Sequence, residues 1–234
     1  LFSEIKLNGE VYDLPNNFWG SYLAVVNANI AGGKSDVFIN QTIEGKIDID
    51  TEGGIFTDLK IEREHTGKNQ KDPWWRADNK NFIQIFTNPG SNLISVNGNN
   101  PRTKNTQTDY KILNYETNSD LEAIESTQIF LNNFQTWISQ AFGKTVFATW
   151  FNTPAGKSNS LNLRYQSQTA KDFQIENGKI YQFIFEKQSG VESALKLTIG
   201  APFGYKWKES QGPVFTYENS QLESRIILNL TLEK

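Results

Sequence analysis

A pair of adjacent tryptophans among polar residues is the feature of this sequence best suited to binding a ligand. The run Asp72-Pro73-Trp74-Trp75-Arg76 places both indoles beside a carboxylate and a guanidinium. Successive side chains of an extended chain point to opposite sides, so both rings cannot face one core. We expect an exposed ring that stacks on a sugar or anchors a protein contact, because Trp and Arg dominate interface hot spots. The ligand-binding candidates are Trp74, Trp75, Arg76, Asp72 and Asn79.

A structural role is the alternative for the same tryptophans. One indole would then fill the core, and the other would cover an edge of the sheet. Sequence alone leaves both interpretations open.

The chain offers little for acid–base or nucleophilic catalysis. His65 is its only histidine, and no Gly-x-Ser-x-Gly sequence that could present a nucleophilic serine occurs. His65 ends an alternating run among charged neighbours, so we expect a surface or strand-end imidazole and not a member of a catalytic triad. The acidic residues are scattered, and nothing selects a pair for glycoside hydrolysis. We therefore expect no catalytic residues and a protein that is not an enzyme.

Metal and cofactor sites are not expected either. Asp48, Asp50 and Glu52 precede Gly53 with the alternation of a calcium-binding loop, but Leu59 stands where such a loop needs its bidentate glutamate. The chain has no cysteine, which excludes thiolate zinc sites and disulfides. We expect these carboxylates to lie on a solvated strand face, with no bound metal and no cofactor.

Composition limits the partners. The 234 residues carry a net charge of −3 and no block of Lys and Arg, so the basic surface of a nucleic-acid-binding or membrane-surface protein is not expected. No apolar run approaches the ~18 residues of a membrane span, so we expect no membrane insertion by this chain. It begins at Leu1 and contains no methionine, so we expect a piece of a longer protein.

Apolar residues that alternate with polar ones dominate the chain and predict strands with one solvated face. The clearest runs are 37–49 and 55–61, joined at Gly53-Gly54 in what we expect to be a hairpin. Similar runs recur between turn sequences, at 82–86, 93–96, 145–153, 158–165, 180–185, 195–199 and 226–232. One stretch, 127–142, has helical spacing and is predicted as a helix. The fold class is all-β: an antiparallel β-sandwich, or two packed sheets, with one short helix.

A second candidate segment lies in a predicted turn between two strands. Gly32 and Gly33 permit a tight turn, and Lys34 and Asp36 could form a short ion pair across it. Local structure and a ligand site would both explain these residue types. The turn residues singled out are Asn29, Gly32, Gly33, Lys34 and Asp36.

Three segments, taken in order, resemble one known family. They are SYLAVVNANIAGGKSD at 21–36, NFIQIFTNPGSNLISVNG at 81–98, and GKTVFATWFNTPAG at 143–156, the last followed by LNLRY at 161–165. Together they resemble the C-terminal region of the DUF4012 family, bacterial proteins of unknown function, over most of the chain. The resemblance implies an envelope protein with a short membrane anchor and a large exterior part. This chain lacks the anchor and the Gly-rich N-terminal half of that family, so the resemblance implies location and architecture and no reaction.

We expect a non-enzymatic binding or structural module of a larger membrane-anchored bacterial envelope protein. It would be extracytoplasmic, held at the cell surface by a segment outside this sequence. The alternative is an accessory domain of an enzyme acting on envelope polysaccharide, with the chemistry in the absent N-terminal half. Partners would be cell-wall polymer, another surface protein, or a second copy bound through exposed strand edges.

The expected domain organisation is one β-rich domain over residues 1–234. The segment 98–109 is rich in Asn, Thr and Lys. Any division would fall there and give the parts 1–97 and 110–234.

Overall fold

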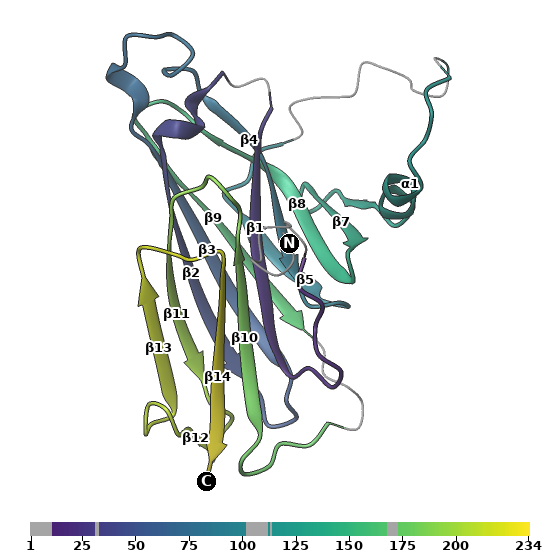
Figure 1. Ribbon diagram of the computed structural model, residues 1–234, viewed down its shortest axis with the longest axis vertical. Coiled ribbons are helices and arrows are strands. Elements are labelled where there is room, and N and C mark those ends of the chain that lie inside the picture. The colour runs from purple at the N-terminus through teal and green to yellow at the C-terminus, as the bar shows by residue number, and fades with distance from the viewer. Residues whose placement is uncertain (1–10, 31–32, 102–111, 113, 168–172) are drawn as a thin grey trace, which may run out of the picture.

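Two β-sheets packed face to face form the body of the protein (Figure 1). The computed structural model describes residues 11–30, 33–101, 112, 114–167 and 173–234. Sheet A has eight strands, in the order β12 (Lys206–Trp207), β14 (Arg225–Glu233), β10 (Ile180–Lys187), β1 (Gly20–Asn29), β4 (Asn79–Thr87), β8 (Lys144–Thr153), β7 (Thr136–Ala141) and β6 (Ile129–Leu131). Sheet B has six, in the order β13 (Val214–Asn219), β11 (Ser193–Gly200), β2 (Ile39–Ile49), β3 (Ile55–His65), β9 (Ser158–Ser167) and β5 (Asn92–Asn97). The predicted all-β fold of two packed sheets is confirmed.

The apolar core lies between the two sheets. On β10 the side chains of Tyr181, Phe183 and Phe185 point inward and are at most 1% exposed. Trp207, from the short edge strand β12, is fully buried and donates its indole N–H to the carbonyl of Ile199 in sheet B at 2.9 Å. Full burial of an aromatic side chain such as Phe stabilises a fold by about 1.5–3 kcal/mol. This aromatic core joins sheet A to sheet B.

Most neighbouring strands run antiparallel, as predicted, but each sheet also contains a parallel pair. β1 pairs with β10 in sheet A, and β2 pairs with β11 in sheet B. Parallel neighbours need long connections, and most of the chain lies between β1 and β10. A half-buried strand shows the same alternation of apolar and polar residues whether its neighbour is parallel or antiparallel. The sequence pattern therefore did not distinguish parallel from antiparallel pairs.

The hairpin of β2 and β3 follows the sequence prediction. Its register pairs Ile39 with His65 at one end and Ile49 with Ile55 at the turn. The first strand begins at Ile39, two residues later than predicted. Residues Ser35–Phe38 form a 3-10 turn, η1, which leaves the Val37 side chain 75% exposed.

Two other predicted turns connect strands of different sheets. The turn after β4, at Asn88-Pro89-Gly90, leads from sheet A to β5 in sheet B, and the turn at Pro154–Gly156 leads from β8 in sheet A to β9 in sheet B. Gly90 and Gly156 take φ of +74° and +75°, the left-handed region that suits glycine. The chain therefore crosses between the sheets at both places, and neither turn closes a hairpin.

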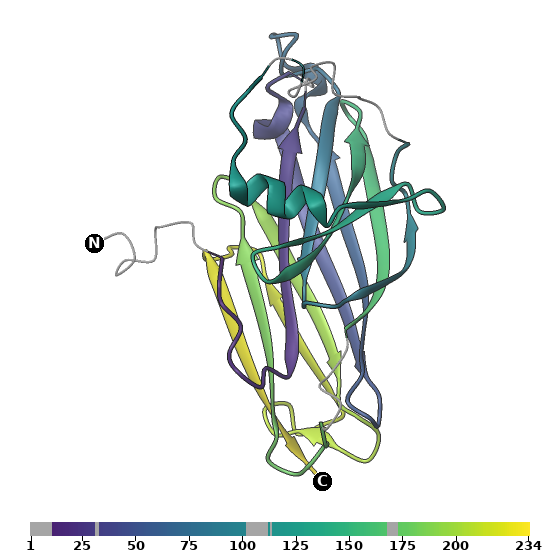
Figure 2. The same cartoon turned by 90° about the vertical axis from the view of Figure 1, so that its right-hand side faces the viewer.

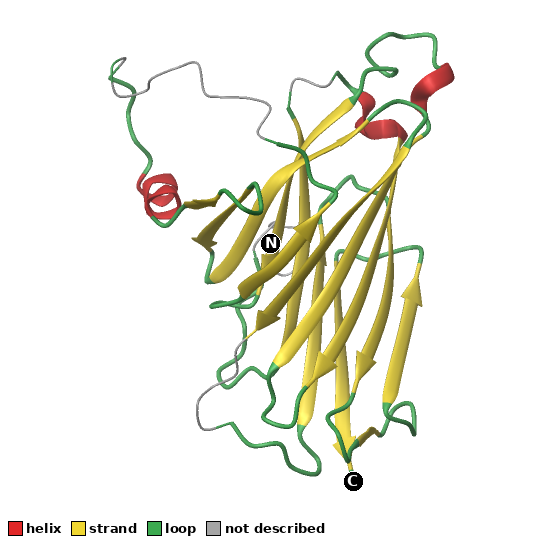
Figure 3. Ribbon diagram, turned by 180° about the vertical axis from the view of Figure 1, so that it is seen from behind, coloured by secondary structure: helices red, strands yellow, loops and turns green. Residues whose placement is uncertain are grey.

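The helix predicted at 127–142 is wrong in position. Helix α1 spans Ser119–Ser126, and β6 and β7 form a hairpin where the helix was expected (Figure 3). Asn132-Asn133 start the turn of this hairpin, and Gln135 takes a φ of +48° that ends any helical repeat. The overlooked signal was Asn118, which accepts the N–H groups of residues 120 and 121 as an N-cap ahead of an acidic first turn.

Strands from both sides of the segment 98–109 share each sheet: β1 and β4 join β8 and β10 in sheet A, and β2, β3 and β5 join β9 and β11 in sheet B. Residues 102–111, which include most of this segment, lie outside the described residues. Within the part of the chain that the structure describes, no helix is long and apolar enough to cross a membrane.

Buried tyrosines make the stability of this fold depend on alkaline pH. Tyr22, Tyr165 and Tyr181 are at most 2% exposed, and burial is the main cause that raises the pKa of each hydroxyl above its usual value. Above pH ~10 the unfolded chain loses these protons and the folded chain keeps them. Each such tyrosine therefore lowers the free energy of unfolding by up to about 1.4 kcal/mol per pH unit. Buried Arg63, with its pKa lowered to about 10, acts in the opposite direction in the same range.

We predict that Tyr181→Phe flattens this alkaline decline. The free energy of unfolding, measured by urea denaturation from pH 10 to 11.5, should fall by about 1 kcal/mol per pH unit less than in the wild type. Ser21→Ala is the control, because it removes the acceptor that Tyr181 Oη bonds at 2.7 Å but keeps the titrating proton. An unchanged slope for Tyr181→Phe would contradict the assignment.

Candidate functional site

The two candidate segments, distant in sequence, meet at one end of the sandwich. We call this end the tip and define it as residues 33–38 and 66–78, which include the 3-10 turns η1 and η2 (Gly67–Asn69) at the top of Figure 1. The Lys34 amide donates to the carbonyl of Trp74 at 3.2 Å. A Cβ on Gly33 would lie 2.6 Å from that same oxygen, so the close approach requires glycine. Gly32 lies outside the described residues.

Trp74 is the more exposed of the two tryptophans. Its side chain is 59% exposed, with Lys34 Nζ 5.3 Å from the ring centroid. The Asp72 carboxylate accepts the Trp74 N–H at 2.8 Å, so Asp72 shapes the loop that carries the ring. Neither indole enters the core: Trp75 is 38% exposed and packs against Phe38 with ring centroids 5.6 Å apart.

The other candidates divide between the surface and the interior. Arg76 is exposed on the tip, and Asp72 is half-buried in its capping role. Asn79 is fully buried, which excludes the surface position expected for it. Its amide donates to Asp36 Oδ1 at 2.9 Å and to Ser35 Oγ at 3.2 Å, and its carbonyl oxygen accepts from Arg63 at 2.8 Å.

Arg63 is a buried guanidinium that joins the sheets beneath the tip. It projects inward from β3, is 2% exposed, and bonds Asn79 of sheet A. Burial lowers the pKa of Arg63 to about 10, partly offset by the Asp36 carboxylate 3.7 Å away. The ion pair predicted between Lys34 and Asp36 is therefore replaced: Asp36 faces Arg63, and Lys34 lies over an indole. The alternation of β3 could have revealed this, since residue 63 falls on the same face as Leu59.

His65 ends β3, in agreement with the strand-end alternative, but its imidazole is buried and structural and does not lie at the surface. The Gly67 N–H donates to its Nδ1 at 3.0 Å, so Nε2 carries the proton and donates to the carbonyl of Ala77 at 2.9 Å. These two bonds tie both ends of the loop 67–77 to the end of β3. A Cβ on Gly67 would meet the carbonyl of Trp75 at 2.6 Å, so this close packing also depends on glycine. His65 thus positions the loop that bears the tryptophans.

Asp50, expected on a solvated strand face, lies instead just after β2 and stabilises the β2–β3 turn. Its Oδ1 accepts the N–H of Glu52 at 2.9 Å and of Gly54 at 2.8 Å. Asp48 forms an exposed ion pair with Lys46 at 3.0 Å. Among the described residues, no group of three or more His, Cys, Asp or Glu side chains is placed to hold a metal.

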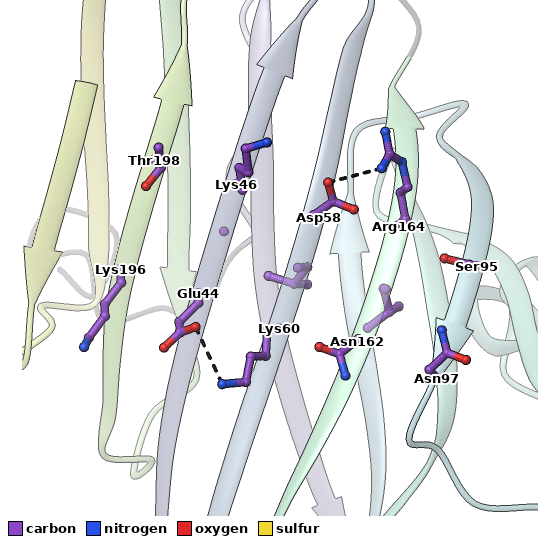
Figure 4. A pocket seen from close by; sticks show the side chains of 13 residues that line it. Glu44, Lys46, Asp58, Lys60, Ser95, Asn97, Asn162, Arg164, Lys196 and Thr198 are labelled. Atoms are coloured by element: carbon purple, nitrogen blue, oxygen red, sulfur yellow. Dashed lines mark ion pairs between the residues drawn. The ribbon is translucent and has the colours of Figure 1, made fainter. Parts of the chain in front are cut away.

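A shallow depression of about 670 Å³ lies over the outer face of sheet B (Figure 4). Opposite charges stand side by side on neighbouring strands: Glu44 is 3.7 Å from Lys60, and Asp58 is 3.5 Å from Arg164. Such cross-strand pairs each stabilise a sheet by roughly 0.2–1 kcal/mol. Among the described residues, no aromatic side chain lines the depression. Its labelled polar residues are Glu44, Lys46, Asp58, Lys60, Ser95, Asn97, Asn162, Arg164, Lys196 and Thr198.

Comparison with known proteins assigns no family. No protein-family model matches the chain, and no curated protein matches its sequence. A candidate nutrient-binding protein from Legionella pneumophila superposes with a TM-score of 0.45 and 8% identity, over 92% of this chain and 71% of that one. An M1 zinc metallopeptidase from Deinococcus radiodurans gives a TM-score of 0.26 and 9% identity, over 82% and 38%. These likenesses are too distant to carry over a function.

We predict that Asn79→Ala lowers the free energy of unfolding by about 2–3 kcal/mol, because it strips the Arg63 guanidinium of a buried acceptor. Asn229→Ala is the matched control: it removes an exposed strand amide that accepts from Gln182 at 2.9 Å and should change stability by under about 0.5 kcal/mol. Chemical denaturation of both variants measures the difference. Equal effects would show that the buried bond does not support the tip.

Proposed function

We propose that this protein is a non-enzymatic binding module whose tip recognises a polysaccharide at the bacterial cell surface. The observation that carries the proposal is Trp74, an indole 59% exposed on a loop whose backbone is fixed. Asp72, His65 and Lys34 supply the hydrogen bonds that fix it. A rigid, exposed aromatic ring is suited to binding, since little conformational entropy is lost when a ligand covers it.

The surroundings of Trp74 favour a sugar over a purely apolar ligand. An indole offers a flat apolar face, on which the C–H face of a pyranose ring can stack. Exposed Arg76, Lys34 and Asp36 lie in the same short segments of the tip and provide donors and acceptors for ring hydroxyls. A protein contact remains the alternative occupant, because Trp and Arg also dominate protein interfaces.

The tip is a better candidate than the depression on sheet B. The part of the chain that the structure describes offers no aromatic ring to the depression, and Lys60 and Arg164 there are already paired with carboxylates. A ligand that displaced these ion pairs would gain little binding free energy, because both partners are solvated and each pair is weak. The charged face therefore serves the sheet, whereas Trp74 makes no comparable structural contact in the core.

The envelope setting rests on the sequence resemblance to the DUF4012 family. In that setting a membrane anchor in another part of the protein would hold the sandwich outside the cell, with the tip free to meet wall polymer. We propose no catalytic role for the tip, because both ring nitrogens of His65 are engaged in hydrogen bonds to the backbone. As an accessory domain of a polysaccharide-acting enzyme, the same tip would hold polymer for a catalytic domain elsewhere.

We predict that Trp74→Ala weakens binding to cell-wall polysaccharide at least about ten-fold, the loss expected for ~1.5 kcal/mol of stacking. Affinity electrophoresis against purified wall polymers, followed by calorimetry on those that retard the protein, measures it. Trp74→Ala should leave the unfolding midpoint within about 2 °C, because the ring is outside the core.

Two control variants decide where a bound polymer lies. Phe203→Ala removes an aromatic ring that is 91% exposed outside the tip, and Lys60→Ala alters the depression on sheet B. Both should bind as the wild type does. The polysaccharide proposal fails if the wild type binds no wall polymer, and the tip assignment fails if Lys60→Ala loses binding while Trp74→Ala retains it.

A further inference from the structure

A short N-terminal segment lies on the outer face of sheet A, away from the core between the sheets. We call residues 11–14 the strap. Val11, Tyr12 and Leu14 pack on a small apolar cluster formed by Tyr22, Ala24 and Ile184 of β1 and β10. Figure 2 shows this purple segment running beside the strands of sheet A before it turns into β1. The outer face of sheet A is thus covered here by a chain segment that is not a strand of the sheet.

Three charged side chains hold the strap at Tyr12: two bond its main chain, and the third lies against its ring. Lys144 Nζ donates to the carbonyl of Tyr12 at 3.0 Å, and the Tyr12 N–H donates to Glu186 Oε2 at 3.0 Å. Arg225 bonds Glu186 through Nε at 2.9 Å and lies 4.6 Å from the centroid of the Tyr12 ring. We call Lys144, Glu186 and Arg225 the clamp.

The clamp is a built site and not a chance surface contact. Lys144 is 2% exposed, and the Glu186 side chain is 15% exposed. Lysine and glutamate are almost never this buried without partners, and here the ammonium and the carboxylate are directed at the carbonyl and the N–H of the same residue, Tyr12. The Tyr22 hydroxyl also donates to Glu186 and so fixes the carboxylate from below. A donor and an acceptor aimed at one main-chain residue, beside an apolar floor, are features of a site for an extended peptide.

A tight turn joins the strap to β1. The Phe18 N–H donates to the carbonyl of Pro15 at 3.1 Å, and Asn17 takes a φ of +61°. This turn directs the strap back onto the sheet of its own chain. The strap of a second copy has the same sequence and can make the same bonds to the clamp, so exchange loses no clamp contact and relaxes the left-handed residue.

We propose that the clamp is an exchangeable peptide site, and that its occupant in trans is the strap of a second copy of this chain, which gives a strap-swapped dimer. This inference is independent of the polysaccharide proposal, because no clamp residue belongs to the tip. Two tips on one dimer would bind a repetitive polymer with higher avidity than one tip.

The first test shortens the turn. Deleting Asn16 and Asn17 in the full chain should prevent the strap from folding back, and sedimentation velocity should show mainly dimers where the wild type shows a monomer–dimer equilibrium. Adding Lys144→Met to the deletion should return the protein to monomer, whereas adding the control Lys208→Met, an exposed lysine, should not. A monomeric deletion variant, or a dimer that persists with Lys144→Met, would overturn the proposal.

The second test supplies the strap as a peptide and does not depend on the deletion variant folding. A fluorescent peptide of residues 9–18 is titrated with the wild type and with the full chain carrying Tyr12→Ala and Leu14→Ala. Fluorescence anisotropy should show at least ten-fold tighter binding to the double variant, whose own strap competes less well. Glu186→Gln in that background should weaken binding at least ten-fold. Failure of the peptide to bind the double variant, with its thermal unfolding still cooperative, would show that the strap is a permanent part of the fold.

Discussion

The hydrogen bond between Arg63 of sheet B and Asn79 of sheet A is the interaction on which the tip depends. Elsewhere the two sheets are held together mainly by the burial of apolar side chains. Apolar contacts have no preferred direction, so they tolerate small shifts of one sheet against the other. At this end of the interior the inward positions are polar instead, so the sheets are joined by bonds with fixed geometry. Asn79 extends the network to Ser35 and Asp36, and His65 extends it to the loop 67–77. A polar interior of this kind specifies one arrangement of the loops above it, because each bond left unmade would cost more than it contributes when made.

That rigidity gives the exposed Trp74 its significance. An exposed ring on a mobile loop binds a ligand less tightly, because the loop loses conformational entropy on binding. Here the backbone around residues 72–76 is held by Asp72, by the Lys34 amide and by the bond from His65 to Ala77. On the outer face of sheet A, buried charged side chains likewise fix the main chain of one strap residue, Tyr12. In both places ionisable side chains fix the position of the main chain, whereas those on the outer face of sheet B form cross-strand ion pairs.

Sequence patterns predicted the strands better than their partners. The alternation of β2 and β3 correctly placed Ile43, Ile47 and Leu59 in the core, since burial of one face is a local consequence of the pleat. The same alternation contains Arg63 and His65 on the inward face. His65 was nevertheless expected at the surface or at a strand end, because its partners Gly67 and Ala77 and the Arg63 partner Asn79 are set by tertiary packing. A helix was wrongly predicted at 127–142 because the apolar residues of the β6–β7 hairpin recur every three or four positions, as they do on one face of a helix. Residue types alone singled out the tryptophans of the loop 67–77. The contact of this loop with the turn at 33–36 depends on tertiary packing, which no local sequence pattern encodes.

The most direct test of the central claim is the indole N–H region of a ¹H–¹⁵N NMR spectrum, recorded while wall polysaccharide is added. The chain has six tryptophans, so each indole reports on one place. The account predicts that the Trp74 resonance shifts with added polymer, while the core resonance of Trp207, bonded to the Ile199 carbonyl, stays fixed. A Trp74 resonance that does not move when the polymer demonstrably binds would contradict the account and place the binding surface elsewhere on the sandwich.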